Sequence, residues 1–204
     1  MAFVIGISGG SGCGKTTAIR MIQERLEGDD ITIISQDDYY HPIERQVRDP
    51  KGVVNFDLPE AIDHFGLKNH IIALKEGREV EISQYTFNNP SAPAEIINLR
   101  PAPILLVEGL FVFHHVHIRE HLDVKVFIDS PAHIRLERRL KRDLVERGYP
   151  EEEIRYQWEN HVEPAFESFL MPHRDSCDMI LDNTLELETQ LDELEEMIKR
   201  RIGY

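Results

Sequence analysis

The stretch GGSGCGKT, residues 9–16, fits the pattern G-x-x-x-x-G-K-[ST] at every fixed position. It follows an apolar segment, Phe3–Ile7, and precedes a helical pattern over Thr16–Glu27. Glycines let a backbone wrap closely around phosphates, so that N–H groups and the helix N-terminus point at the anion. The stretch therefore predicts a nucleotide-binding loop in which Lys15 reaches the β- and γ-phosphates and Thr16 holds Mg²⁺. The residues expected to bind the nucleotide are Gly9, Gly10, Ser11, Gly12, Cys13, Gly14, Lys15, Thr16 and Thr17.

Apolar runs that suit strands covered on both faces alternate with helical patterns along the chain. The alternation predicts an α/β fold of the P-loop NTPase type, a doubly wound parallel sheet with helices on both faces, as a single domain over residues 1–204. The segment Glu79–Leu99 breaks the alternation and predicts an inserted β-hairpin. The strands are expected at Phe3–Ile7, Ile31–Ile34, Ile104–Val107, Val124–Ile128 and Met179–Leu181, and the helices at Thr16–Glu27, Pro59–Lys75, Pro131–Arg147, Glu151–Leu170 and Leu185–Ile202.

The overall composition narrows the class of protein. With 41% hydrophobic and 29% charged residues, and no apolar run near the length of a membrane span, the chain reads as a soluble globular protein. A net charge of −14 argues against nucleic acid and anionic membranes as partners. The first residues, MAFVIGISGG, lack the basic start of a signal peptide. Cys13 and Cys177 suggest no disulfide framework, so we expect a cytoplasmic protein.

Residues outside the phosphate loop decide what the nucleotide is used for. The chain has no Asn-Lys pair, which a GTPase uses to read its base, and its charge opposes a motor that moves on nucleic acid. A small-molecule kinase needs a carboxylate that positions a hydroxyl beside the γ-phosphate. Ligands in this fold bind beyond the carboxyl ends of the strands. Asp37 and Asp38 follow one predicted strand and Glu108 follows another, so these carboxylates are the candidates.

Arginines supply the positive charge that phosphoryl transfer requires. Arg135, Arg138, Arg139 and Arg142 have the spacing i, i+3, i+4, i+7, which places them on one face of a helix, beside an apolar stripe of leucines. In an otherwise acidic chain, we interpret residues 131–149 as an arginine-rich lid that closes over phosphates. The leucines of the stripe are Leu136, Leu140 and Leu144.

The ordered set of motifs resembles the uridine kinase (uridine-cytidine kinase) family of P-loop nucleoside kinases. The resemblance extends over nearly the whole chain. The segments that resemble family motifs are GISGGSGCGKTT (the phosphate loop), SQDDYY (S-Q-D-x-[FY]-Y), NFDLPEAID (N-F-D-x-P), QYTF (Y-D-F), VEGLFVF (the E-G strand end), RRLKRDLVERG (the arginine lid) and HVEPAFESFLMPHRDSCDMIL (the helix and last strand).

The resemblance implies ATP-dependent 5′-phosphorylation of a pyrimidine ribonucleoside in pyrimidine salvage, assisted by Mg²⁺. It implies Asp37 as the catalytic carboxylate, since the family's aspartate directly follows Ser-Gln, whereas Asp38 falls on the variable position. Alternation along a strand would also point these two side chains in opposite directions. The other roles that the resemblance implies are catalysis by Lys15 and Arg142; the ribose site at Asp57; the base pocket at Tyr40, Phe56, Tyr85 and Phe87; nucleoside or phosphate contacts at Arg139 and Arg147; and Mg²⁺ binding by Thr16, Asp37 and Glu108.

Three departures from the family pattern leave the acceptor open. Thr86 replaces the middle residue of Y-D-F, Pro90 replaces the histidine that reads the pyrimidine edge, and Tyr149 replaces a lid arginine. The alternatives are a kinase of the same family acting on another nucleoside, a sugar or a vitamin alcohol, and a nucleotide-binding regulatory module without an acceptor. A homo-oligomer is expected by family analogy.

A histidine-rich segment does not by itself predict a metal site. His114, His115, His117 and His121 lie within eight residues, and His117 and His121 have the i, i+4 spacing of some zinc ligands. However, no glutamate follows His117, and the segment corresponds to an ordinary helix of the family.

Overall fold

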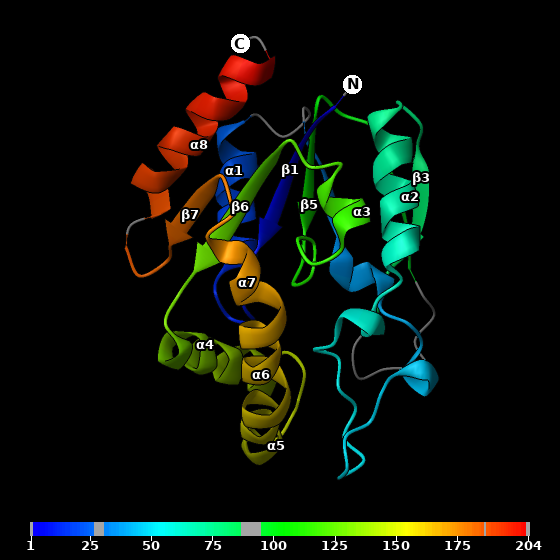
Figure 1. Cartoon of the computed structure of the whole chain (residues 1–204), viewed down its shortest axis with the longest axis vertical. Helices are drawn as coiled ribbons and strands as arrows, with labels where there is room; N and C mark the ends of the chain where they lie inside the picture. Colours follow the sequence, from blue (N-terminus) through cyan, green and yellow to red (C-terminus); the bar gives the residue numbers. More distant parts are fainter. Residues whose placement is uncertain (1, 27–30, 87–94, 186, 203–204) are drawn as a thin grey trace.

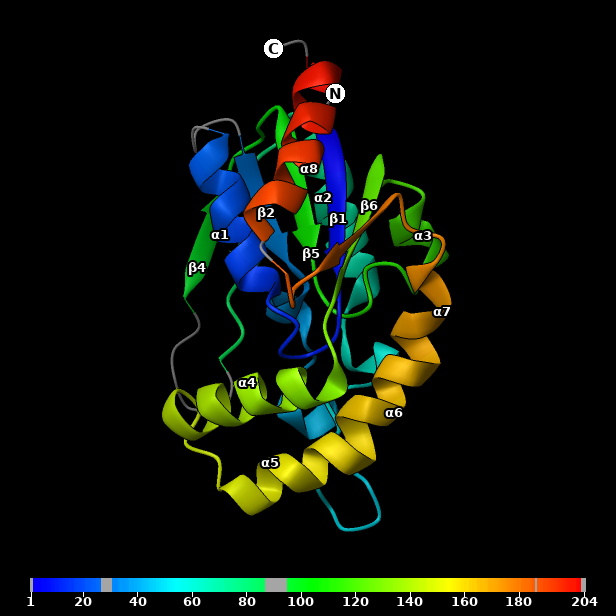
Figure 2. The same ribbon diagram turned by 90° about the vertical axis from the view of Figure 1, so that its left-hand side faces the viewer.

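The fold is built on a parallel sheet of strands that are buried on both faces. A computed structural model describes residues 2–26, 31–86, 95–185 and 187–202. Within these ranges the strand order is β2-β5-β1-β6-β7, and every neighbouring pair is parallel. The carboxyl ends of the strands point toward α4 and α5 (Figures 1 and 2). The strands are β1 (Phe3–Ser8), β2 (Ile31–Ser35), β5 (Ile104–Glu108), β6 (Val124–Asp129) and β7 (Met179–Asp182).

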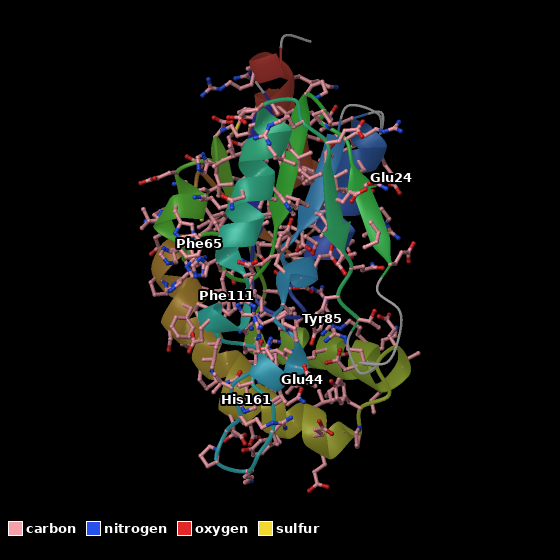
Figure 3. All side chains as sticks on the ribbon, turned by 90° about the vertical axis from the view of Figure 1, so that its right-hand side faces the viewer. Glu24, Glu44, Phe65, Tyr85, Phe111 and His161 are labelled. Carbon is pink, nitrogen blue, oxygen red and sulfur yellow. The ribbon has the colours of Figure 1, made fainter. Side chains whose placement is uncertain are left out.

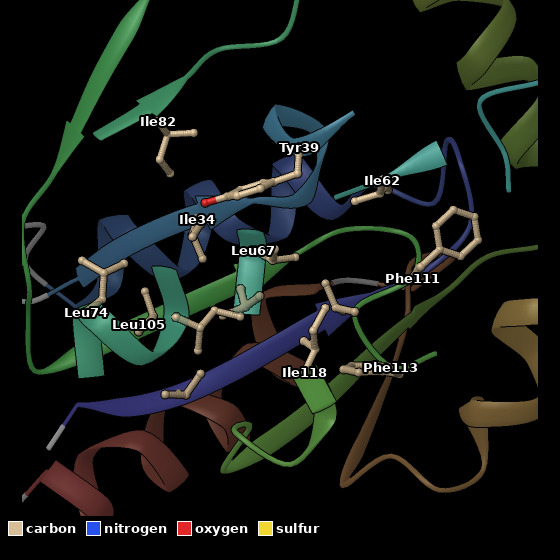
Figure 4. Close-up of a cluster of buried hydrophobic side chains, with 14 of the residues drawn as sticks. Ile34, Tyr39, Ile62, Leu67, Leu74, Ile82, Leu105, Phe111, Phe113 and Ile118 are labelled. Atoms are coloured by element: carbon tan, nitrogen blue, oxygen red, sulfur yellow. The ribbon is translucent and has the colours of Figure 1, made fainter. Parts of the chain in front are cut away.

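Helices cover the two faces of the sheet, as expected for a doubly wound fold. α1 (Lys15–Arg25) and α8 (Leu187–Ile202) lie on one face, and α2 (His64–Lys75) and α3 (Val116–Arg119) lie on the other (Figure 1). Side chains alternate between the two cores along each strand, because successive residues of a strand point to opposite faces. In β5, for example, Leu105 packs toward α2 and Leu106 toward α1. Figure 4 shows the core on the α2 side, where each fully buried aliphatic side chain contributes about 1.5–3 kcal/mol to folding.

The predicted helix over Pro59–Lys75 is wrong in its first turn. Residues Pro59–Ala61 form a short 3-10 helix, and α2 begins only at His64. The carboxylate of Asp63 accepts a hydrogen bond from the Gly66 amide at 2.9 Å and so caps the N-terminus of α2. This interruption matters for the site because it turns the chain directly after Asp57.

The predicted helix over Glu151–Leu170 is interrupted twice by π-helical turns. The order is α5 (Glu151–Gln157), the π turn Trp158–Val162, α6 (Glu163–Ala165), the π turn Phe166–Leu170 and α7 (Met171–Arg174). A proline follows each π turn within two residues, Pro164 and Pro172, and proline lacks the N–H that an α-helix would use there. Each π turn places one extra residue in the helix.

The inserted hairpin is present as an antiparallel strand pair. β3 (Val80–Ser83) pairs with β4 (Ile96–Leu99), and Val80 lies opposite Leu99. Val80 and Ile82 are buried, as their alternation predicts. Phe87 and Pro90 lie outside the described residues. No helix in the described ranges is long and apolar enough to span a bilayer.

Candidate active site

The phosphate loop takes a conformation that only glycine allows at two positions. Gly12 and Gly14 have φ angles of +80° and +101°, in the left-handed region that side chains disfavour. A Cβ on Gly12 would also lie 2.2 Å from the backbone carbonyl oxygen of Arg135. A Cβ on Gly14 would lie 2.1 Å from the side-chain amide nitrogen of Asn183. Gly14 directly precedes α1, whose N-terminus has no side-chain cap. The loop therefore offers its backbone donors and the positive end of α1 to an anion.

The loop residues divide into those that line a cavity and those that support it. Ser11, Gly12, Gly14, Lys15, Thr16 and Thr17 line the cavity, as a nucleotide site requires. Gly9, Gly10 and Cys13, which the sequence also assigns to binding, are not in the lining. The Gly9 carbonyl accepts a hydrogen bond from the Lys15 ammonium at 2.9 Å, which fixes the position of that charge. Cys13 is fully buried, and burial raises the pKa of its thiol.

The cavity has a volume of about 350 Å³, within the range of small-molecule sites. Its lining residues come from the carboxyl ends of the strands and from α4 and α5. Figure 2 shows that α4 and α5 lie beyond these strand ends. The cavity brings together the phosphate loop, the ends of β2 and β5, the segment before α2, and the helices α4 (Ala132–Val145) and α5. Besides the loop residues, the lining consists of Asp37, Tyr40, Val54, Phe56, Asp57, Glu108, Leu110, Arg138, Arg139, Arg142, Arg147, Tyr149, Gln157 and His161.

The two aspartates after β2 point to different places, but not for the reason expected from the sequence. The expectation of strand alternation is wrong, because Gln36–Tyr39 forms a 3-10 helix. Its first turn is capped by the Ser35 hydroxyl, which accepts from the Asp37 amide at 3.3 Å. Asp37 lines the cavity, whereas the Asp38 carboxylate accepts a hydrogen bond from the Tyr85 amide at 3.4 Å. Only Asp37 is therefore placed to face a ligand there.

Glu108 is the second carboxylate of the cavity, at the end of β5. Burial and the neighbouring charge of Asp37 raise the pKa of Glu108 to about 7, although Lys15 and a hydrogen bond from the Ser35 hydroxyl oppose this shift. Two carboxylates facing one cavity are costly unless a cation binds between them. Together with the Thr16 hydroxyl, Asp37 and Glu108 form an oxygen donor set of the kind that suits Mg²⁺.

We predict opposite effects of Glu108→Gln on stability and on turnover. Because the pKa of Glu108 in the folded state lies above about 4.3, its unfolded value, the folded protein binds the proton more tightly. The contribution to stability is therefore fully present below about pH 4.3 and is lost as the pH rises toward 7. At about pH 8 and without Mg²⁺, Glu108→Gln should raise the free energy of unfolding by on the order of 1 kcal/mol. With Mg·ATP present, the same variant should lower kcat at least about tenfold.

Denaturant unfolding at about pH 5 and about pH 8, on either side of the Glu108 pKa, measures the stability effect in the wild type and the variant. The difference between the two proteins should be larger at the higher pH, and Mg²⁺ should stabilise only the wild type. A variant that is less stable than the wild type at both pH values would show that Glu108 is a structural carboxylate.

Aromatic side chains and an aspartate line another part of the cavity. Tyr40 and Phe56 line it, with ring centroids 5.5 Å apart and planes at 85°. Tyr85 is not in the lining; its ring centroid lies 5.5 Å from that of Tyr40 and 6.3 Å from that of Phe56, so it supports both. Burial raises the pKa of the Asp57 carboxyl, while Arg139 and His161 oppose the rise. This part of the cavity combines the flat apolar rings of Tyr40 and Phe56 with the Asp57 carboxylate, which can accept hydrogen bonds.

Two of the four arginines of α4, Arg135 and Arg139, are buried, whereas Arg142 is half-buried and Arg138 is exposed. Arg139 is 7% exposed, while Leu144 in the predicted apolar stripe is 43% exposed. The buried Asp143 explains the inversion, because its carboxylate lies 3.2 Å from Arg139 Nε and 2.7 Å from Arg142 Nε. Arg147 Nε lies 3.6 Å from the same carboxylate. A shared internal anion therefore holds these three arginines beside the cavity.

Arg139 links two walls of the cavity. It donates 2.9 Å hydrogen bonds to the hydroxyl of Ser11 in the phosphate loop and to the side-chain carbonyl of Gln157 in α5. Arg135, in contrast, is absent from the lining; it donates to Glu163 at 3.0 Å and stacks over Phe166, with its guanidinium carbon 3.8 Å from the ring centroid. Arg135 thus fastens α4 to α6, whereas Arg138, Arg139, Arg142 and Arg147 line the cavity.

Sequence reasoning missed several wall residues, above all Gln157 and His161. Both come from the helical segment after the lid, on either side of the α5–π-turn boundary. His161 Nε2 lies 2.9 Å from the Asp49 carboxylate, which also accepts from the Tyr156 hydroxyl at 2.6 Å. The hydrogen bond from Tyr156 is the main cause of a lowered pKa of Asp49, and the bond with His161 adds to it. The pKa of Asp49 falls to about 2. In Figure 3, His161 and Tyr85 lie below the strands of the sheet. Val54 and Leu110 were missed as well, whereas Arg138 and Tyr149 belong to the predicted lid, residues 131–149.

Comparisons with known proteins agree over most of the chain. The model of the Phosphoribulokinase / Uridine kinase family matches residues 4–190. Uridine-cytidine kinase B of Dictyostelium discoideum is 36% identical over 190 residues, which cover 91% of this chain and 78% of that protein. A uridine kinase of Deinococcus deserti is 34% identical over 200 residues, 98% of this chain and 97% of that protein. The solved structure of phosphoribulokinase from Rhodobacter spheroides superimposes with a TM-score of 0.64 at 19% identity, over 89% of this chain and 70% of that one. At this identity the likeness is one of fold.

Proposed function

Since the chain belongs to the phosphoribulokinase/uridine kinase family, and is thus a kinase, we propose that it transfers the γ-phosphate of ATP to the 5′-hydroxyl of uridine or cytidine. The products are the nucleoside monophosphate and ADP, a reaction of pyrimidine salvage. The observation that supports this proposal best is the shared cavity of Lys15, Asp37 and Asp57. It provides a phosphate site, a carboxylate for a hydroxyl and a carboxylate for a sugar in one place.

The transfer requires one bond to form and one to break at the γ-phosphorus. The 5′-oxygen attacks that phosphorus while its proton moves to the Asp37 carboxylate. The bond between the γ-phosphorus and the bridging oxygen breaks, and ADP leaves with the electron pair. Lys15 and Arg142 stabilise the charge that develops on the transferred group and on the leaving oxygen. Mg²⁺, held by Thr16, Asp37 and Glu108, would neutralise part of the charge on the β- and γ-phosphates.

The nucleoside would occupy the aromatic part of the cavity. Asp57 accepts hydrogen bonds from the ribose hydroxyls, and Tyr40 and Phe56 contact the base. Tyr85 packs against the rings of Tyr40 and Phe56 outside the lining. Arg139 and Arg147 contact the nucleoside or the phosphates, and the part that Phe87 plays in the base pocket remains a prediction. We assign the reading of the base edge to Gln157 and His161, because Pro90 cannot supply the imidazole of the family pattern.

An acceptor panel tests the proposed function. Purified protein with Mg·ATP is incubated with uridine, cytidine, adenosine, guanosine, a hexose and a vitamin alcohol, and both ADP and the phosphorylated product are measured. We expect ADP and nucleoside monophosphate in equal amounts with uridine or cytidine, and no acceptor-dependent ADP with 5′-deoxyuridine. Faster product formation with a sugar or vitamin would replace the proposed substrate, and ADP release that ignores every acceptor would favour a regulatory module. From the family resemblance we also propose a single-domain, cytoplasmic homo-oligomer.

We predict that Phe56→Ala weakens binding of the nucleoside and leaves ATP binding nearly unchanged. Loss of one aromatic contact with a base is worth about 1–3 kcal/mol, so the KM for uridine should rise roughly 5–150-fold. Tyr85→Ala is the matched control, because Tyr85 supports Phe56 without lining the cavity, and its effect should be smaller. Steady-state kinetics with each substrate varied in turn measures both. Equal increases in both KM values would show that these rings stabilise the fold and not the nucleoside.

A further inference from the structure

A cluster of histidines lies on the α2 side of the sheet, apart from the cavity lining. His64 begins α2, His115 directly precedes α3, and His117 lies within α3. One nitrogen from each of the three rings lies within 4.8 Å of the others. His64 Nδ1 and His117 Nε2 are 2.9 Å apart, and the rings of His64 and His115 are stacked with centroids 4.1 Å apart. The fold thus brings together three imidazoles from two segments that lie far apart in the sequence.

One ring nitrogen of the cluster has no hydrogen-bond partner in the described part of the chain, and two others share a single hydrogen bond. His115 Nε2 is buried and has no hydrogen-bond partner among the described residues. The same ring makes a hydrogen bond with the backbone of Pro59, whose carbonyl is the only hydrogen-bonding group that a proline backbone offers. Burial, and then the neighbouring histidines, lower the pKa of His115 to about 4, so the ring is neutral at neutral pH. Metal-binding histidines are commonly held in this way, with one nitrogen bonded to the protein and the other free.

We propose that His64, His115 and His117 bind one divalent transition-metal ion, for which zinc is the best fit. Neutral imidazoles prefer zinc, copper or nickel, whereas Mg²⁺ prefers oxygen, so this site is chemically distinct from the carboxylates of the cavity. Zn–N bonds of about 2.0–2.1 Å in tetrahedral geometry place ligand nitrogens roughly 3.4 Å apart. The present nitrogen positions, from 2.9 Å to at most 4.8 Å apart, bracket this spacing. A water molecule completes the tetrahedron.

A metal at this place joins two segments that leave the cavity. The segment from Asp57 to His64 supplies one ligand, and the segment from Glu108 to His117 supplies two. Both segments begin at a cavity carboxylate, so the ion would cross-link the two backbones that position Asp57 and Glu108. Three histidines and a water also occur in catalytic zinc sites, but none of these three histidines lines the cavity that holds the phosphate loop. We therefore assign the ion a stabilising role.

A cobalt titration tests the site directly. The full chain, without a polyhistidine tag, is titrated with Co²⁺ in millimolar Mg²⁺, which keeps the cavity carboxylates occupied by the harder ion. We expect visible d–d absorption that saturates at one Co²⁺ per chain and disappears when Zn²⁺ is added. His64→Gln, His115→Gln and His117→Gln should each weaken binding at least about tenfold. Zn²⁺ at about 100 times its Kd should raise the Tm of the wild type by roughly 5–10 °C.

His121→Gln is the matched control. His121 lies four residues after His117, at the spacing that suggests a zinc pair in the sequence, yet it is not part of the cluster. This variant should bind Co²⁺ like the wild type. Loss of binding in His121→Gln together with retention in His64→Gln would overturn the proposal. Absence of a stoichiometric Co²⁺ site in the wild type would overturn it as well, whatever the stability of the variants, and circular dichroism without metal shows whether each variant is folded.

Discussion

Asp37→Asn should lower kcat by about 10²–10⁴-fold while ATP still binds. The amide keeps the size of the side chain but cannot accept the proton of the acceptor hydroxyl, and general-base contributions have this magnitude. Asp37 lines the cavity together with Lys15, so its loss acts where the phosphate and the acceptor meet. Rapid-quench measurement of a single turnover, combined with nucleotide-binding titration, separates the chemical step from ATP affinity. The same experiment tests the regulatory-module alternative, since a binding protein has no acceptor-dependent turnover to lose.

Asp38→Asn is the control that the chain itself provides. Its carboxylate accepts from the Tyr85 amide and does not line the cavity, so kcat should change by less than about tenfold. Both variants remove one negative charge from the same 3-10 helix, and thus differ only in where the side chain points. A severe effect of Asp38→Asn with a mild effect of Asp37→Asn would reverse the catalytic assignment.

Lys15→Ala should lower kcat by about 10²–10³-fold, with a smaller change in the KM for ATP. Negative charge shifts toward the bridging oxygen as the bond to the γ-phosphate breaks, so a fixed cation there stabilises the transition state more than the bound substrate. The hydrogen bond from Lys15 to the Gly9 carbonyl holds the ammonium in position before the reaction. Steady-state kinetics gives both parameters.

Lys141→Ala is the matched control for loss of a positive charge, because Lys141 is exposed on α4 and does not line the cavity. Its kinetics should remain close to those of the wild type. Near-normal turnover of Lys15→Ala would remove the assignment of residues 9–16 as the nucleotide site.

The central sheet could be predicted from the sequence because its strands are buried on both faces. A short continuous apolar run such as Ile104–Val107 is typical of such a strand, and the phosphate loop marked the end of the first strand and the start of the first helix. The errors occurred where a local contact decided the backbone. The Asp63 side chain delays the start of α2, and the Ser35 hydroxyl begins a 3-10 turn at the point where an extended chain was expected. Such contacts leave no periodic signal.

The residues of the candidate site that could be predicted are those that belong to a sequence motif. Lys15, Thr16, Asp37 and Glu108 were found in this way and line one cavity. The burial of Arg139 could not be predicted, because it depends on the buried carboxylate of Asp143, which pairs with Arg139 and Arg142. His64 could not be connected with His117 from the sequence, since only the packing of α2 against α3 brings them together. Residues joined by tertiary structure alone are therefore the ones that a pattern misses.

The π turn Trp158–Val162 adds one residue to the helical segment 151–174. The number of residues in this segment therefore matters as much as their identity. Deletion of one residue in the π turn would restore an α-helix and rotate everything after it by about 100° relative to α5. After such a deletion, either Gln157 would leave the cavity, or Phe166 and Leu170 would leave the core. The turn at Gly52 is less constrained, because a side chain added there would meet open space and the turn does not lie within a helix. Insertions and deletions should therefore be tolerated near Gly52 and rejected between Gln157 and Phe166.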